Sequence, residues 1–432
     1  MKVSYYSLGC KVNLYESEAI INQFIDNGFT LAQFDDICDV YIINTCSITK
    51  VSDAKSRKII RQAIRRNVEA VIAVMGCYAQ LSPEDIKTIE GVDVLVGTNN
   101  RDKLFDLTIE SLKTKKPRFL VDDIMKIADY EEIKINRYNN KTRGFIKIQD
   151  GCDNYCSYCT IPYARGHIRS RKAEDIIEEI QLLTDSGMKE IVLTGINTAS
   201  YGRDFEDYDF SSLLLDIVNK VENLGRIRIS SIEVTEITDR LLKVIKENED
   251  KFCNHFHIPL QAGANNTLKR MHRKYNIDFY KEKINLIKSL FKDVNITTDV
   301  LAGFSGETEK DFNDACAFIK AIGFGEMHIF PYSRRPKTAA YNFPNQIENS
   351  IKQSRVSKLL KLNSQSALAY RKQFLNRNLS VLVEKVEDGI AYGHSENYLP
   401  VKFAADVNVN DLVNVEITEI GYPNCKGELI SV

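Results

Sequence analysis

The sequence has no long apolar segment and no strong net charge. None of its apolar runs approaches the roughly 18 residues that a membrane-spanning helix needs. The first six residues contain no apolar core of the kind found in a secretory signal peptide. A formal net charge of −1 over 432 residues neither demands nor excludes a nucleic-acid partner, so local charge has to decide that point. We therefore expect no membrane partner.

Disulfide bonds are not expected either. The chain has ten cysteines, too few for a disulfide scaffold, and several of them are spaced as metal ligands are. This cysteine usage predicts a reducing, cytoplasmic location. The length predicts about three domains, at roughly 150 residues each. A hydrophobic fraction of 44% is ample for their buried cores.

Short apolar runs alternate with helical patterns through most of the chain. This alternation predicts a parallel-sheet α/β domain over residues 1–112. Residues 113–142 have weak periodicity and are predicted to be a linker. Over residues 143–375 the pattern returns with six strands, which predicts a six-stranded partial (β/α) barrel because the closed form has eight. Residues 376–432 contain only short strands and predict a small all-β domain, an open barrel.

Three cysteines directly follow the first predicted strand of the barrel. Cys152, Cys156 and Cys159 form a C-x3-C-x2-C motif. Three thiolates this close can hold three irons of a cubane cluster and leave the fourth iron open. The alternatives are a structural zinc site, which normally takes four protein ligands, and three unrelated buried cysteines. The spacing and its place after a strand favour the cluster.

A second set of cysteines is spread over the first domain. Cys10, Cys46 and Cys77 each lie just past the carboxyl end of a predicted strand, whereas Cys38 precedes its strand. In a parallel sheet those ends share one edge, where ligands bind. The three thiols are therefore expected to converge. Ordinary buried cysteines are the alternative, but with the motif downstream a second cluster is favoured.

These segments resemble the methylthiotransferase family of the radical S-adenosylmethionine (SAM) superfamily. The resemblance extends over nearly the whole chain. Its motifs are SLGCKVN (7–13), MGCY (75–78), KIQDGC (147–152), IPYARG (161–166), HIPLQAG (257–263) and FPYS (330–333). Two positions depart from the family's usual pattern: Ser305 stands where proline is common and Lys337 where glycine is common. Neither is a cluster ligand, so they bear on fine substrate geometry.

The resemblance implies a methylthiotransferase domain, a radical SAM domain and a C-terminal TRAM domain. It implies that Cys152, Cys156 and Cys159 hold a [4Fe–4S] cluster whose open iron binds SAM. It also implies that Cys10, Cys46 and Cys77 hold an auxiliary [4Fe–4S] cluster. One SAM molecule would methylate a sulfur on that cluster, and another would yield the radical that activates the substrate. An electron donor such as flavodoxin or ferredoxin, and a sulfur donor, are implied partners.

The substrate expectation comes from residues beside the cysteines. Residues 11–16 and 149–151 look like the branch that modifies carbon 2 of threonylcarbamoyladenosine, next to the anticodon of tRNA. The same chemistry on isopentenyladenosine in tRNA, or on a ribosomal-protein side chain, is the alternative. A non-catalytic electron-transfer or sensor protein is the remote one. Arg334 and Arg335, at the rim after the last barrel strand, are candidates to face the threonine carboxylate.

Other polar residues are candidates for SAM. Gly195 and Asn197 end the second barrel strand, and Gln261 ends the fourth. Loop capping is the alternative for Asn197 and for Gln261. Arg165 is a candidate for the SAM carboxylate or for an RNA phosphate, with a surface salt bridge as its alternative.

One segment is suited to RNA. Residues 55–66 contain six cations and no acid, and Arg57, Arg61 and Arg65 recur at every fourth position on one helical face. Such a face suits a phosphate backbone, although a solvated helix surface is an equal alternative. The all-β domain, with four Lys or Arg against nine Asp or Glu from residue 376 onward, would need a local patch or stacking to bind RNA.

Overall fold

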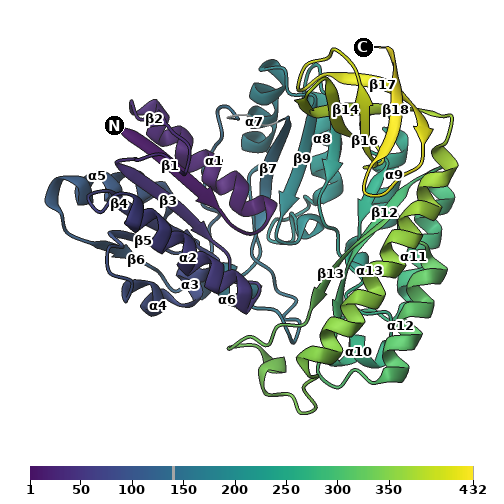
Figure 1. Cartoon of the computed structure of the whole chain (residues 1–432), viewed down its shortest axis with the longest axis horizontal. Helices are drawn as coiled ribbons and strands as arrows, with labels where there is room; N and C mark the ends of the chain where they lie inside the picture. The colour runs from purple at the N-terminus through teal and green to yellow at the C-terminus, as the bar shows by residue number, and fades with distance from the viewer. Residues whose placement is uncertain (139–141, 432) are drawn as a thin grey trace.

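The computed structural model describes residues 1–138 and 142–431 (Figure 1). It consists of a parallel sheet with helices on both faces, an open curved barrel, and a small closed barrel. In the part of the chain described, no helix is both long and apolar enough to cross a membrane. The predicted α/β class and its three-part organisation are confirmed.

The N-terminal sheet has six parallel strands in the order β2-β1-β3-β4-β5-β6. Its central strands β3 and β4 are buried along their whole length, because helices cover both faces. The elements are β1 (Lys2–Ser7), α1 (Lys11–Asp26), β2 (Thr30–Leu31), β3 (Val40–Thr45), α2 (Lys50–Arg66), β4 (Val71–Gly76), α3 (Cys77–Leu81), α4 (Pro83–Lys87), β5 (Val94–Val96), α5 (Leu104–Thr114) and β6 (Arg118–Leu120).

The predicted linker is partly wrong. β6 falls inside residues 113–142 and pairs in parallel with β5, so the sheet extends to Leu120. A three-residue strand is too short to show alternation in the sequence. Farther along, Ile133 and Ile135 are buried against α1, so this segment packs on the domain that it leaves. Residues 139–141 of the predicted linker lie outside the described residues.

The central domain is the predicted partial barrel. Six parallel strands follow one another as β7, β9 and β10 in one sheet and β11, β12 and β13 in the next. Parallel bridges between Ile227 and Phe252 and between Ser231 and His257 join the two sheets. The strands are β7 (Arg143–Asp150), β8 (Arg169–Ser170, antiparallel to β7), β9 (Glu190–Gly195), β10 (Arg226–Ile229), β11 (His255–His257), β12 (Asn295–Ala302) and β13 (Glu326–Pro331).

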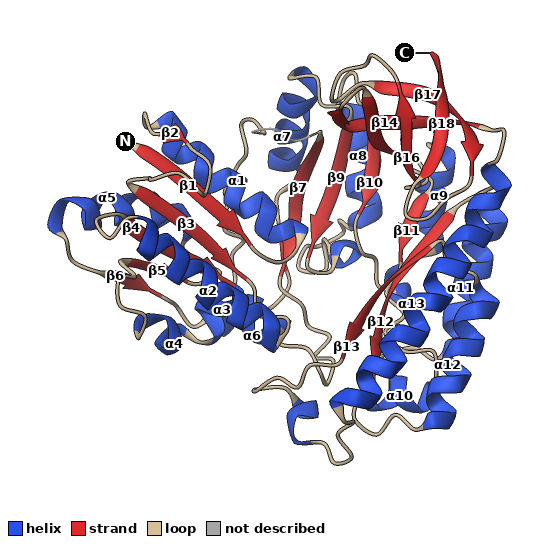
Figure 2. Ribbon diagram, viewed as in Figure 1, coloured by secondary structure: helices blue, strands red, loops and turns tan. Residues whose placement is uncertain are grey.

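Helices cover the outside of this barrel (Figure 2). Apolar side chains of alternate strand residues pack against them in the largest core of the molecule. The helices are α6 (Ile161–Arg165), α7 (Ala173–Asp185), α8 (Phe210–Lys220), α9 (Asp239–Glu247), α10 (Asn265–Arg270), α11 (Ile277–Leu290), α12 (Glu309–Ile322) and α13 (Asn349–Arg371). The opposite strand faces point into the barrel, where polar residues dominate.

The C-terminal domain is a closed five-stranded barrel in the order β14-β15-β16-β18-β17, so the expected open barrel is wrong. Pairing of β14 with β17 closes it. Such long-range pairing leaves no local sequence signal. The strands are β14 (Asn378–Glu387), β15 (Ile390–Ser395), β16 (Pro400–Ala404), β17 (Leu412–Glu419) and β18 (Cys425–Ser431).

This small barrel covers the amino ends of the central strands. Arg226 and Arg228 of β10 donate hydrogen bonds to backbone carbonyls of the C-terminal domain at 3.0–3.2 Å. The Tyr398 ring stacks on His255 at 4.9 Å between centroids. The carboxyl ends of the strands are thus left for the N-terminal domain, whose α1 contacts β7 and β9.

Candidate functional site

The loop with Cys152, Cys156 and Cys159 is closed against the start of the barrel. Cys152 N–H donates to the Gly166 carbonyl at 3.0 Å, and Cys159 N–H donates to the Cys156 carbonyl at 2.9 Å. Gly151 has a φ of +74°, and a Cβ there would lie 1.8 Å from a backbone oxygen. Only glycine fits this turn. The backbone therefore holds the three thiols in a fixed loop.

The three thiols are shielded from water to different degrees. Burial raises the pKa of the Cys152 thiol to about 11 and that of Cys159 to about 12. Cys156 Sγ instead accepts a hydrogen bond from Arg273 Nη1 at 3.2 Å, and Arg273 is ion-paired with Glu233. Thiols with raised pKa values release protons when they bind a metal, so loading of this loop is coupled to pH.

The second triad lies as predicted, at the carboxyl-end edge of the N-terminal sheet. Cys10 caps α1, Cys46 directly follows β3, and Cys77 begins α3 directly after β4. Gly9 has a φ of +106°, and a Cβ there would lie 3.2 Å from Cys46 Sγ. The glycine thus leaves room beside the thiol. Burial raises the pKa of Cys77 to about 12 and also raises that of Cys46.

One cavity of about 570 Å³ connects the two triads. It is lined from one side by Cys10 and Cys46 and from the other by Cys159. Its remaining lining residues are apolar or hydroxyl-bearing, apart from one lysine, one aspartate and one glutamine. The other lining residues are Leu8, Gly9, Ile48, Thr49, Ser52, Lys55, Tyr158, Thr160, Ile161, Gln261, Asp299, Leu301, Phe330, Pro331, Tyr332 and Ser333.

The cysteines of each triad are farther apart than the ligands of a single ion. Four thiolates around one zinc lie about 3.8 Å apart, given bonds of about 2.3 Å. Among the residues that the structure describes, the one group of three possible ligands with atoms within 4.8 Å of one another contains no cysteine. Both triads are therefore more widely spread than the ligands of a single ion. The cavity beside them has room for larger groups.

A buried group of charges joins the N-terminal domain to the barrel. We call it the Glu16 cluster. The Glu16 carboxylate of α1 pairs with Arg165 at 2.5 Å, with Lys147 at 2.9 Å and with Arg101. Asp150 pairs with Lys147 at 2.6 Å and with Arg165 at 3.2 Å. The surrounding cations hold the pKa values of Glu16 and Asp150 well below their usual range, despite burial, which acts in the other direction.

Arg165 is thus not where the sequence interpretation put it. Its side chain is fully buried, so it is neither a surface salt bridge nor a free ligand for SAM or a phosphate. Its Nε instead donates to Cys77 Sγ at 3.4 Å. Counting Glu131 and Arg169 at its edge, the Glu16 cluster has one more cation than anion. This excess favours negative charge on Cys77.

The three other SAM candidates lie around the barrel mouth. Gln261 lines the cavity with a φ of +62°. Gly195 and Asn197 are placed by Gln149, whose Oε1 accepts the Asn197 N–H at 2.9 Å. A Cβ on Gly195 would meet the same Oε1 at 3.0 Å. Gln149 therefore fixes this turn, a role that the sequence reading missed.

The three predicted RNA-binding arginines do not share one environment. Arg61 and Arg65 are exposed on α2, as expected. Arg57 is half-buried and donates to the Tyr78 hydroxyl at 2.7 Å. Lys55 lies two residues before Arg57 on the same helix. It lines the cavity and was missed as a site residue.

Neither arginine of the 334–335 pair points freely into the cavity. Arg335 is buried, and it pairs with Asp53 at 2.5 Å and with Ser47 Oγ at 2.8 Å, so it ties the barrel to the N-terminal domain. Its charge already has a partner, which disfavours the predicted contact with a substrate carboxylate. Arg334 is exposed and lies over the Tyr341 ring at 4.3 Å.

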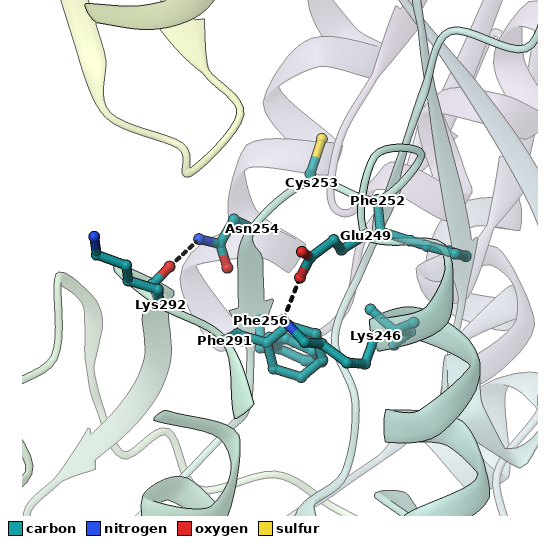
Figure 3. A pocket seen from close by; sticks show the side chains of 9 residues that line it. Lys246, Glu249, Phe252, Cys253, Asn254, Phe256, Phe291 and Lys292 are labelled. Carbon is teal, nitrogen blue, oxygen red and sulfur yellow. Dashed lines mark hydrogen bonds and ion pairs between the residues drawn. The ribbon is translucent and has the colours of Figure 1, made fainter. Parts of the chain in front are cut away.

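A separate pocket of about 280 Å³ is shown in Figure 3. Lys246 pairs there with Glu249 at 2.5 Å, and the Asn254 amide donates to the Lys292 carbonyl at 2.7 Å. The pocket includes Cys253, which precedes β11. It therefore lies at the amino end of a strand, away from the edge that holds both triads, and no triad member lines it.

Known protein families match two parts of the chain. Residues 146–319 match the Radical SAM superfamily, and residues 2–97 match the Uncharacterized protein family UPF0004. The chain is 43% identical over its full length to the threonylcarbamoyladenosine tRNA methylthiotransferase MtaB of Bacillus subtilis, of which it covers 96%. It is 36% identical over 96% of its length to the MtaB of Aquifex aeolicus, covering all of that protein.

Other similar proteins are more distant. A tRNA-2-methylthio-N(6)-dimethylallyladenosine synthase of Thermoanaerobacter pseudethanolicus is 34% identical over 99% of this chain and 93% of that protein. Among solved structures, the radical SAM methyltransferase TsrM of Kitasatospora setae aligns over 78% of this chain and 76% of its own, with a TM-score of 0.57. At 13% identity that likeness concerns the fold alone.

The Glu16 cluster leads to a prediction about stability. Glu16→Gln leaves its buried cations undercompensated, so unfolding in urea should require about 3–5 kcal/mol less free energy. Because the folded-state pKa of Glu16 is depressed, this difference should be present at neutral pH and shrink as the pH falls below about 4. Glu84→Gln, which breaks an exposed pair with Lys87, should change it by at most about 1 kcal/mol. Equal effects of both variants would contradict the role of the cluster.

Proposed function

Because the chain belongs to the methylthiotransferase family of radical SAM enzymes, we propose that it adds a methylthio group to carbon 2 of threonylcarbamoyladenosine, next to the anticodon of tRNA. The observation that carries this proposal is the cavity of about 570 Å³ between the two triads, which is lined by Cys10 and Cys46 of one set and by Cys159 of the other. A substrate base in that space would be in reach of both. The full-length similarity to the two MtaB enzymes supports the choice of base.

The radical SAM domain implies SAM and one [4Fe–4S] cluster. We assign this cluster to Cys152, Cys156 and Cys159, and a second [4Fe–4S] cluster to Cys10, Cys46 and Cys77. When bound, these groups supply the electron, the methyl group, the sulfur and the radical that an unactivated aromatic carbon requires. The protein supplies position, and the Arg273 guanidinium and the Glu16 cluster each place a cation against one thiol.

The chain's own residues also hold the cavity in shape. Arg335 and its partners Asp53 and Ser47 fasten the barrel rim to α2 and to the segment before it. Gln149 fixes the turn after β9, where Gly195 and Asn197 are proposed to receive SAM, together with Gln261. These contacts orient the reactants without taking part in bond making.

The partners follow from the proposed reaction. An anticodon loop presents unstacked bases that proteins can splay out, and the exposed Arg61 and Arg65 of α2 provide phosphate contacts beside the cavity. The reaction also needs an electron donor such as flavodoxin or ferredoxin, and a sulfur donor. We expect the enzyme to act in the cytoplasm, because a tRNA substrate and metal-binding thiols both suit a reducing compartment.

Lys55 is the residue that we propose for the threonine carboxylate of the modified base. It is the one Lys or Arg among the described residues that line the cavity. Ser52, one helical turn earlier, and Thr49, the cap of α2, add hydroxyl groups on the same side. An ammonium flanked by hydroxyls suits a carboxylate. Lys55 thus takes the part that the sequence interpretation gave to Arg335.

The two clusters should have separable ligands. After anaerobic reconstitution and removal of loose metal with EDTA, the protein should hold about eight irons, four in each cubane. Replacing Cys152, Cys156 and Cys159 with Ala should halve the iron content and abolish reductive cleavage of SAM.

The matched control replaces Cys10, Cys46 and Cys77 with Ala. It should also halve the iron content, but it should retain SAM cleavage and lose methylthio transfer. Loss of all iron in either variant would contradict the two-site assignment. Methylthio transfer by the variant without Cys10, Cys46 and Cys77 would also contradict it.

The substrate is tested by mass spectrometry of tRNA nucleosides. Cells without the protein should lack 2-methylthio-threonylcarbamoyladenosine and accumulate its unthiolated precursor. Purified protein with both clusters should restore the nucleoside on tRNA from those cells. Loss of the isopentenyl analogue instead would move the chain to the branch of the dimethylallyladenosine synthases.

The role of Lys55 is tested by a matched pair of substitutions. Lys55→Met should remove a charge-assisted contact worth about 1.5–3 kcal/mol, which lowers kcat/KM on modified tRNA roughly 10- to 100-fold. Lys58→Met removes the same charge from an exposed position of the same helix that does not line the cavity, and should leave kcat/KM within about threefold. Equal decreases of kcat/KM in both variants would indicate that Lys55 makes only a nonspecific phosphate contact.

A further inference from the structure

We propose that the inner wall of the barrel holds a third metal site, formed by His257, Asp299 and His328. These residues lie on the adjacent strands β11, β12 and β13. Each offers one ligand atom, and the three atoms lie within 4.8 Å of one another. No other group of three possible ligands in the described part of the chain is this close. The site is separate from both cysteine triads.

The distances are those of metal ligands. His257 Nε2 lies 3.4 Å from Asp299 Oδ1. Two ligands held about 2.1 Å from one ion in tetrahedral geometry are separated by roughly the same distance. The His328 ring lies 5.6 Å from the His257 ring, centroid to centroid. The ligand atom of His328 lies within 4.8 Å of those of His257 and Asp299, so binding one ion requires it to move somewhat closer to them.

Thr297 orients the first ligand. Its hydroxyl lies 2.9 Å from His257 Nδ1 and 2.8 Å from Nε2 of His255. A hydroxyl has one hydrogen, so it donates to one ring and accepts from the other. When His257 Nδ1–H donates, the Nε2 lone pair points at Asp299 and is free for a metal. Metal-binding histidines are commonly fixed through their second nitrogen in this way.

The third ligand is otherwise unused. Within the described residues, the His328 side chain has no hydrogen bond or ion pair, and its ring contacts the ring of His257. It lines a second cavity of about 330 Å³ toward the C-terminal domain, whereas Asp299 lines the cavity between the triads. The site therefore has access from two sides and keeps open coordination positions.

The donor set selects the class of ion. Two imidazoles and one carboxylate are the ligands of divalent transition metals such as Zn²⁺ and Fe²⁺, with positions left for water or a substrate oxygen. The ion would also change the charge of the cavity. Asp299 is the one acid among the described lining residues, and a bound divalent ion turns its −1 into a net +1. That charge favours carboxylate-bearing substrates, a step that rests on the proposed function.

The test measures binding alone and needs no tRNA. Mn²⁺ is used as the probe because it prefers nitrogen and oxygen to the thiolates of the clusters. It is titrated into EDTA-treated protein that holds both oxidised clusters, and free Mn²⁺ is counted from its six-line EPR signal. One Mn²⁺ should bind per chain, with ¹⁴N modulation from the two imidazoles in the pulsed EPR spectrum.

Variants locate the ion. His328→Ala and the isosteric Asp299→Asn should each weaken binding at least 10-fold, while both keep the cluster absorbance that reports correct folding. Thr297→Val should weaken it about 10- to 100-fold through loss of orientation. His394→Ala, which removes a histidine of the C-terminal domain, should leave it unchanged. Absence of bound Mn²⁺ and of bound Zn²⁺ in the wild type, or unchanged binding in Asp299→Asn, would overturn the site and leave a hydrogen-bonded network only.

Discussion

The Glu16 cluster is the interaction on which the placement of the two triads depends. Its members come from α1, from Arg101 in the turn before α5, from β7 and from α6, so the pairs of Glu16 with Lys147 and Arg165 exist only when the N-terminal domain lies against the barrel. Charges taken out of water are tolerated only when each finds partners of good geometry. Separating the two domains would take Glu16 away from Lys147 and Arg165. The cluster therefore sets the separation of the triads as well as joining the domains.

This constraint explains the composition of the cavity. Its walls carry mostly apolar and hydroxyl-bearing side chains, because the charged residues nearby are consumed in domain contacts such as Arg335 with Asp53. A low-polarity space protects a radical from side reactions and accepts a flat aromatic base. The two charged residues that remain, Lys55 and Asp299, lie on opposite domains. Each is a point where a polar group of a ligand can be recognised.

Sequence reasoning succeeded where the signal is local. The alternation of strand and helix follows from apolar periodicity, and the rule that parallel strands end at one edge then brings Cys10, Cys46 and Cys77 together. It failed where the outcome depends on partners far along the chain. Nothing near Arg165 predicts that its guanidinium meets a glutamate 149 positions away. The closure of the C-terminal barrel was missed for the same reason, and β6 because three residues are too few for a pattern.

At Lys337, the family pattern and the structure can be compared at one position. The family commonly has glycine there, and the structure gives this residue a φ of +68°. For a lysine, this left-handed backbone conformation is unfavourable by about 1–2 kcal/mol. Its Nζ lies 3.3 Å from the Leu81 carbonyl of the N-terminal domain, a contact that glycine cannot make. Lysine at this position therefore strains the backbone, but it adds one more hydrogen bond between the domains.

The hydrogen bond from Arg165 to Cys77 has a consequence for the order in which the enzyme matures. During synthesis the N-terminal domain emerges first, with all three cysteines of its triad, but the guanidinium that faces Cys77 is 88 positions later. Until the barrel has folded and docked, Glu16 has Arg101 but lacks Lys147 and Arg165, and Cys77 lacks its cation. We expect the early chain to be a poor acceptor of iron and sulfide, so that auxiliary cluster insertion follows barrel folding. The order can be tested by measuring the uptake of labelled iron by chains whose synthesis is halted before or after residue 165. Equal acquisition of the cluster by both chains would contradict it.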